Sequence, residues 1–132
     1  MINEIYFGRN KGKTFCLKHI IKTYLGQHPD ELMNLKKQGF PILAESYNKS
    51  QERSVLVIVP DRQSIKDFKN TDNRLKVCTT KDIIEGGAFR GMRFSMLCVD
   101  NIDLIDEKEI SQIFMLYKLP KTICYVTKNK SG

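Results

Sequence analysis

The sequence lacks the features that mark membrane-spanning and secreted proteins. No apolar run approaches the ~20 residues that a membrane span needs. The first residues, Met1-Ile2-Asn3-Glu4-Ile5, carry neither the basic segment nor the long apolar stretch of a secretory signal. No internal repeat, linker or low-complexity stretch divides the 132 residues. We therefore expect one domain that covers residues 1–132, no membrane partner and a cytoplasmic location.

Residues with the spacing of metal ligands are also scarce. The only histidines are His19 and His28, and the four cysteines form no CxxC pair. Three of the cysteines lie in apolar, strand-like runs, where a free thiol behaves as a small apolar side chain. We expect buried, reduced thiols in a reducing compartment, with a metal or disulfide set as the alternative. The cysteines are Cys16, Cys78, Cys98 and Cys124.

The charge balance is basic. Twenty-two Lys and Arg residues against fifteen Asp and Glu residues give a net charge of +7. That balance admits an anionic partner such as a nucleotide or DNA, although many basic proteins bind neither. The alternation of aromatic and basic residues that single-strand binders use is missing. The charge therefore allows DNA as a candidate partner, although the sequence contains no motif for DNA binding.

Five short apolar runs alternate with helical patterns along the chain. The run at 55–59 is continuously apolar and β-branched, which is typical of a parallel strand that is buried on both faces. Such alternation predicts βαβ units, and therefore an α/β fold in which helices cover both faces of a mainly parallel, five-stranded sheet. The runs lie at 2–7, 55–59, 75–78, 96–99 and 122–127, and an insert without a clear pattern lies at about 28–50.

Helices are predicted between these runs by spacing and by end signals. Leu17, Ile20, Ile21 and Tyr24 repeat at i, i+3, i+4 and i+7 before Gly26. The same spacing recurs at 110, 113, 114 and 117 before a proline. Thr79-x-x-Asp82 resembles a capping box that opens a short helix, and an aspartate at 61 could cap another helix through residue 68.

The loop after the first predicted strand has a composition that suits phosphate binding. Residues 7–14 read FGRNKGKT and lie directly before a predicted helix. Glycines let backbone N–H groups face a phosphate, and the helix N-terminus adds its dipole. The loop resembles the Walker A loop of P-loop NTPases, and its FGRxxGKT form resembles the GGRxSGKS loops of phage terminase ATPases.

This resemblance implies that Lys13 contacts the β- and γ-phosphates of ATP and that Thr14 holds Mg²⁺. The loop departs from the family pattern, because the first consensus glycine falls on Phe7 and Lys11 replaces a small residue. A lysine-rich surface turn that matches by chance stays the alternative. The implied nucleotide-binding residues are Gly8, Arg9, Asn10, Lys11, Gly12, Lys13, Thr14 and Phe15.

A second motif follows the apolar run at 96–99. Asp100 ends this run, and the preceding RGMRF segment resembles the RGxRF lead-in of terminase and helicase-like ATPases. The resemblance implies that Asp100 binds Mg²⁺ through water. The family's catalytic Glu is replaced by Asn101, whose amide can position water but cannot accept its proton. Asp103 is the nearest carboxylate that could replace this Glu. The alternative for Asp100 is a plain turn that ends the strand.

The last predicted strand ends in polar residues. It resembles the sensor strand of AAA+ and related ATPases, whose polar side chain reads the γ-phosphate from between the two Walker motifs. Thr127 is favoured over Asn129 for that role, and a plain polar end of the strand is the alternative. The resemblance also implies the strand order 5-1-4-3-2. Arg90 and Arg93, with Arg9, are candidates to complete the site of a neighbouring copy in a homo-oligomer or larger complex, or else belong to a solvated loop.

Two functions are compatible with these motifs. One is a minimal RecA-like ATPase core that binds Mg·ATP, or another NTP, and hydrolyses it slowly as an accessory protein in phage-type DNA metabolism or packaging. In that case Lys13, Asp100, Asn101 and Asp103 are the catalytic candidates, and the host cytoplasm is the location. The other is an inactive or weakly active P-loop scaffold that senses nucleotide and binds protein or nucleic acid.

Overall fold

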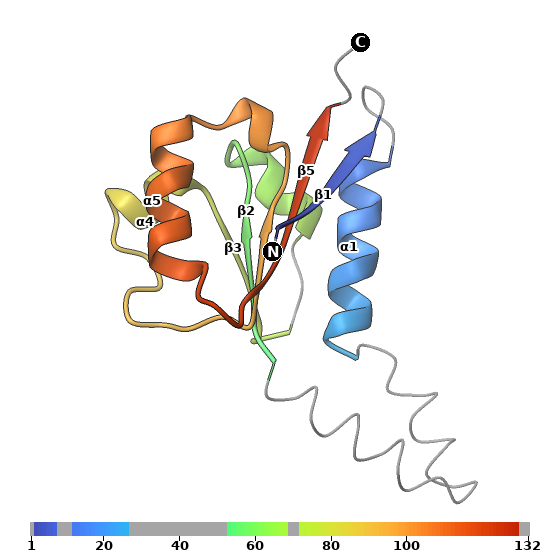
Figure 1. The fold of residues 1–132 in the computed structure, drawn as a ribbon, viewed down its shortest axis with the longest axis horizontal. Helices are drawn as coiled ribbons and strands as arrows, with labels where there is room; N and C mark the ends of the chain where they lie inside the picture. The colour runs from blue at the N-terminus through green and yellow to red at the C-terminus, as the bar shows by residue number, and fades with distance from the viewer. Residues whose placement is uncertain (1, 8–11, 27–52, 69–71, 130–132) are drawn as a thin grey trace, which may run out of the picture.

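Strands and helices alternate along the chain, as the apolar runs predict. The computed structural model describes residues 2–7, 12–26, 53–68 and 72–129, so the insert predicted at 28–50 lies outside the described residues (Figure 1). The strands are β1 (Ile2–Phe7), β2 (Val55–Ile58), β3 (Leu75–Cys78), β4 (Met96–Val99) and β5 (Ile123–Asn129). The helices are α1 (Lys13–Tyr24), α4 (Thr80–Ile84) and α5 (Glu107–Tyr117), with 3₁₀ turns η1 (Gln63–Phe68) and η2 (Ile102–Leu104).

All strand pairs are parallel. The centre of the sheet has the order β3-β2-β4-β5, and β1 extends it beside β5. The carboxyl ends of the strands therefore meet at one edge, which is the upper edge in Figure 1. This is the edge at which parallel α/β proteins place their ligands.

The predicted strand order 5-1-4-3-2 is wrong. β5 lies between β1 and β4, and β2 rather than β3 pairs with β4. Burial gives the physical reason. Thr127 in β5 is fully buried and so are all residues of β2, which suits interior strands, whereas Lys76 and Val77 in β3 are only half-buried, which suits an edge strand. The predicted order also places the loop strand directly beside the Asp100 strand, whereas β5 separates these two strands.

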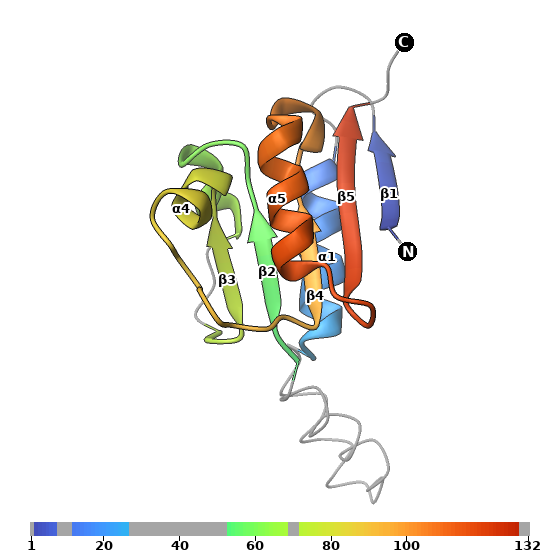
Figure 2. The same ribbon diagram turned by 60° about the vertical axis from the view of Figure 1, so that its left-hand side comes forward.

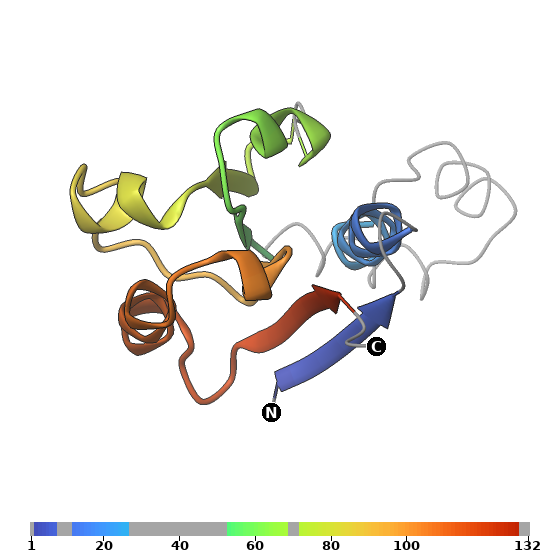
Figure 3. The same cartoon turned by 90° about the horizontal axis from the view of Figure 1, so that it is seen from above.

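Helices cover both faces of the sheet and make three layers (Figures 2 and 3). On one face, α1 packs Leu17 and Ile21 against alternate residues of β2 and β4. On the other face, α5 packs Ile110 and Ile113 against the remaining residues of these strands, with α4 beside it. The apolar spacing that predicts both helices is therefore the spacing of their buried residues.

The short α4 begins where the capping box predicts. The Thr79 hydroxyl accepts a hydrogen bond from the Asp82 N–H, and the Asp82 carboxylate accepts one from the Thr79 N–H. The aspartate at 61 also caps a turn, because the Asp61 carboxylate accepts hydrogen bonds from the N–H and hydroxyl of Ser64. That turn is the 3₁₀ turn η1. None of the helices in the described part of the chain has the length and apolarity to cross a membrane.

Candidate functional site

The candidate site lies at the carboxyl edge of the sheet, where α1 begins. Gly12 has a left-handed backbone (φ 77°) and precedes the first helical residue, Lys13. A glycine suits this position because it takes positive φ without steric cost. The Gly12 carbonyl accepts the first helical hydrogen bond from the Cys16 N–H at 2.8 Å. The backbone thus turns into the helix so that its first N–H groups face the edge.

Asp100 lies at the end of β4 and is 1% exposed. Its N–H donates to the Ile58 carbonyl at 2.9 Å, which extends the pairing with β2. Its carboxylate accepts hydrogen bonds from the hydroxyls of Thr14 at 3.0 Å and Thr127 at 2.6 Å. The amide of Asn101 donates to it at 3.4 Å. A buried carboxylate needs such donors, because leaving it without them is costly.

Asn101 links this carboxylate to Lys13. The Lys13 ammonium donates to the Asn101 side-chain carbonyl at 2.5 Å, and the Lys13 residue is 7% exposed. Asn101 has a left-handed backbone (φ 51°), which asparagine tolerates better than most residues. Its N–H donates to the Thr127 hydroxyl at 2.8 Å. One lysine and one carboxylate are thus held near each other by an asparagine and a threonine.

The structure brings together five of the predicted site residues from the ends of three elements. They are Lys13, Thr14, Asp100, Asn101 and Thr127. Thr127 is fully buried, and its hydroxyl holds Asp100 and Asn101. This contact differs from the direct phosphate contact that a sensor residue would make.

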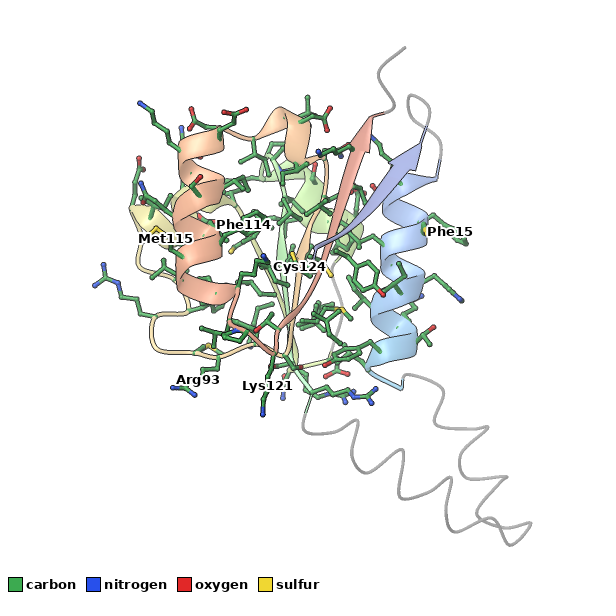
Figure 4. All side chains as sticks on the ribbon, in the orientation of Figure 1. Phe15, Arg93, Phe114, Met115, Lys121 and Cys124 are labelled. Carbon is green, nitrogen blue, oxygen red and sulfur yellow. The ribbon has the colours of Figure 1, made fainter. Side chains whose placement is uncertain are left out.

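Other predicted residues lie elsewhere. Asp103 is in η2, and its side chain is exposed. Phe15 is 77% exposed and points away from the sheet on the outer side of α1 (Figure 4). The remaining loop candidates, Gly8, Arg9, Asn10 and Lys11, lie outside the described residues.

The two candidate arginines are far from the site of their own chain. Arg90 and Arg93 are exposed in the connection between α4 and β4. Arg93 lies near the start of β4, and Figure 4 shows it at the edge opposite the carboxyl ends of the strands. Neither arginine takes part in the hydrogen bonds that join the cluster, and their action in a neighbouring copy stays a prediction.

The oxygen atoms of the cluster suit a magnesium ion. Mg²⁺ binds few protein oxygens and keeps several waters. The Thr14 hydroxyl and the Asp100 carboxylate place two such oxygens 3.0 Å apart. Within the described residues, no group of three or more His, Cys, Asp or Glu side chains could hold a metal ion. Thr14 and Asp100 are therefore the residues of the cluster that could hold such an ion.

The cysteines near the site are not suited to act as nucleophiles. Burial, aided by the charges of Cys124 and Asp100, raises the pKa of Cys98 far above its usual range. Burial also raises the pKa of Cys124 to about 11. A thiol that keeps its proton is a poor nucleophile. The prediction that three cysteines are buried is confirmed for Cys78, Cys98 and Cys124.

The structure has a groove at the same edge that the sequence analysis did not predict. It has a volume of about 780 Å³ and lies between the N-terminal ends of α4 and α5. Its lining includes Pro60 and Asp61 after β2, Thr79 after β3, and Leu104 and Asp106 before α5. The polar residues that follow each predicted strand could have indicated this groove, because the carboxyl ends of parallel strands lie at one edge of a sheet.

No protein-family model matches the sequence, and no curated protein matches it either. The function is therefore argued from the geometry of this cluster and from the motifs.

Proposed function

We propose that the chain binds Mg·ATP, or another nucleoside triphosphate, at the start of α1 and hydrolyses it slowly. The observation that carries this proposal is the hydrogen bond from the Thr14 hydroxyl to the buried Asp100 carboxylate at 3.0 Å. A P-loop uses a hydroxyl at the start of a helix as a ligand of Mg²⁺, and a carboxylate at the end of a strand to hold the water shell of that ion. Their closeness is therefore the geometry that the motifs require.

The other parts of the cluster fit this use. Lys13 carries its charge at the first helical position, where the helix dipole also favours an anion. Binding a phosphate would exchange the Lys13–Asn101 hydrogen bond for an ion pair with the ligand. Thr127 fixes the orientation of Asp100 and Asn101. The bound metal would screen the phosphate charge, and Asp100 and Thr14 would hold it.

Hydrolysis should be slow because the position that faces Lys13 carries an amide. A general base must accept a proton from the attacking water, and Asn101 cannot do so. Asp103 is exposed in η2, so it does not replace Asn101 in the cluster. Water activation would therefore depend on orientation by the Asn101 amide.

The first experiment is calorimetric titration with Mg·ATP of the wild type, Lys13→Ala and Lys22→Ala. Lys22 is exposed in the last turn of the same helix and serves as the matched control. We expect saturable binding that Lys13→Ala loses and Lys22→Ala keeps. If all three folded proteins release no heat and bind nothing, the nucleotide site does not exist.

A nucleotide-sensing module is the second candidate, and Asn101 favours it. A site that binds but barely hydrolyses would keep the nucleotide as a signal for a protein or nucleic-acid partner. Phosphate release, measured with and without DNA, separates the two candidates. Turnover that Lys13→Ala abolishes supports the ATPase, and binding without measurable turnover supports the sensor. The phage-type DNA role and the action of Arg90 or Arg93 in a neighbouring copy stay predictions from the motif resemblance.

A further inference from the structure

The two ends of the helical layer formed by α4 and α5 carry opposite charge. At the carboxyl edge of the sheet, the groove between the N-terminal ends of the two helices is lined by five carboxylates and two cations. We call this groove the acidic groove. Its carboxylates belong to Asp61, Asp82, Glu85, Asp106 and Glu109. This local excess of negative charge stands out on a chain whose net charge is +7.

A second groove lies at the other end of the same layer. It has a volume of about 720 Å³ and lies between α4, the C-terminal half of α5 and the loop that precedes β4. Arg90 and Arg93 are the only charged residues that line it, and both are exposed. The apolar part of its lining includes Met92, Leu116 and Leu119. We call this groove the arginine groove.

The loop beside the arginine groove is anchored. The Tyr117 hydroxyl donates to the Phe89 carbonyl at 3.0 Å, and the Tyr117 ring packs edge-on against Phe94. Phe89 also makes an edge contact with Phe94. These contacts tie the loop to α5, so the groove is preformed and a partner need not order it.

The arginine groove exposes more apolar surface than an isolated surface residue would. Leu116 is 58% exposed, Met92 42% and Leu119 37%. Contiguous apolar surface beside charged residues is typical of protein-binding sites. A strand of nucleic acid would prefer exposed aromatic rings between the arginines, and the only aromatic residue of the lining, Tyr117, is buried. A protein segment with apolar and acidic side chains fits this groove better.

The chain itself presents such a segment at its opposite edge. Leu104 is 64% exposed on the rim of the acidic groove. Asp103, Asp106 and Glu107 flank it in the sequence, and all three are exposed. An exposed apolar side chain among carboxylates is the complement of an apolar groove flanked by arginines.

We propose that copies of this chain associate head to tail. In this contact, Leu104 of one copy enters the arginine groove of the next, and Arg90 and Arg93 meet the carboxylates of the acidic groove. A two-fold axis that passes through either groove would place like charges against each other, which opposes association. Because the two surfaces lie at opposite ends of one layer, each copy can contact two neighbours. The inference does not depend on nucleotide binding.

The test uses two doubly substituted chains. Arg90→Glu/Arg93→Glu reverses the charge of the arginine groove, and Glu85→Arg/Leu104→Arg cancels the negative excess of the acidic groove and replaces its exposed leucine. None of these four residues belongs to the Lys13–Asp100 cluster, and circular dichroism with urea unfolding checks that each variant folds. Sedimentation equilibrium then measures the mass of each protein without nucleotide.

We expect the wild-type mass to rise with concentration across roughly 10–300 µM, the range of small, weak interfaces. Added salt should oppose this rise, because it screens the charges. Each variant alone should weaken association at least about tenfold. Mixing the two variants should restore association, because one supplies an intact acidic groove and the other an intact arginine groove.

Three results would overturn the proposal. The first is a wild type that stays monomeric over this range. The second is a wild-type mass that levels off at that of a dimer, which indicates a closed, two-fold contact. The third is an assembly that both variants keep, which places the contact on another surface.

Discussion

Asp100 shows how single residues set the chemistry of the cluster. Its carboxylate is buried, and the donors around it come from α1, β5 and its own neighbour in the chain. A buried charge is tolerated only when donors surround it, so these side chains must fold into one arrangement. Thr127 has the largest role in this arrangement, because its hydroxyl donates to Asp100 and accepts from the Asn101 N–H.

The Thr127→Val substitution tests this arrangement. Valine keeps the shape of threonine but leaves the Asp100 carboxylate and the Asn101 N–H each short of one partner. We expect unfolding to become easier by about 1–3 kcal/mol, measured by urea denaturation, together with weaker Mg·ATP binding. Thr127→Ser keeps the hydroxyl and should retain most of both. Equal stability of the valine and serine variants would contradict the role given to this hydroxyl.

Asn101→Asp tests whether the missing base limits hydrolysis. Aspartate has nearly the same shape and also tolerates the left-handed backbone, and its carboxylate can accept a proton. We expect phosphate release to rise at least about tenfold, toward the lower range of general-base effects. Asp103→Asn is the matched control and should leave turnover unchanged, because Asp103 is exposed. A fall in turnover with Asp103→Asn would identify Asp103 as the base.

At the scale of elements, α4 depends on its first residue. The helix has only five residues, so intrinsic propensity contributes little and the capping box at Thr79 and Asp82 contributes much. Thr79→Ala should lower the free energy of unfolding by about 1 kcal/mol, measured by urea denaturation. Thr23→Ala, at an exposed position within α1, should change it by much less. Equal losses for the two variants would contradict a capping role.

The elements were predictable from the sequence, whereas their order in the sheet was not. Apolar spacing in α1 and α5 identifies their buried faces, because a helix must bury one stripe. The order of the strands depends on which of them are covered by helices on both faces. The short apolar runs of this sequence differ too little in composition to show which these are. The lysine in β3 was a signal for an edge strand, since Lys76 lies half-buried in that strand.

At the scale of the whole molecule, the motifs predicted the cluster better than its surroundings. The grouping of Lys13, Thr14 and Asp100 was predictable because the motifs that they resemble fix residue type and spacing. The role of Thr127 toward Asp100 depends on β5 lying beside β4, which no local pattern encodes. The same holds for the acidic and arginine grooves, whose linings come from segments distant in the sequence. The local motifs could therefore be read from the sequence, whereas the two grooves, which depend on how distant segments pack, could not.

The buried thiols predict how the stability of the whole molecule depends on pH. Burial, with the charge of Asp82, raises the pKa of Cys78 from 9.0 to about 12. Burial raises that of Cys124 from 9.0 to about 11, and raises that of Cys98 further. In the unfolded chain the thiols lose their protons as the pH rises through 9.0, while the folded chain keeps them. The stability is therefore fully present below pH 9.0 and is lost as the pH rises toward the folded values.

We expect the free energy of unfolding to fall above pH 9.0 by up to about 1.4 kcal/mol per pH unit for each thiol. Urea unfolding at a series of pH values between about 7.5 and 10, the range in which an ordinary thiol titrates, measures this slope. Cys124→Ala should make the slope shallower by the share of one thiol, whatever it does to stability at neutral pH. A free energy of unfolding that stays constant through this range would contradict this prediction. It would show that the thiols are accessible to solvent, and that α1 and α5 cover the faces of β4 and β5 less closely than the structure indicates.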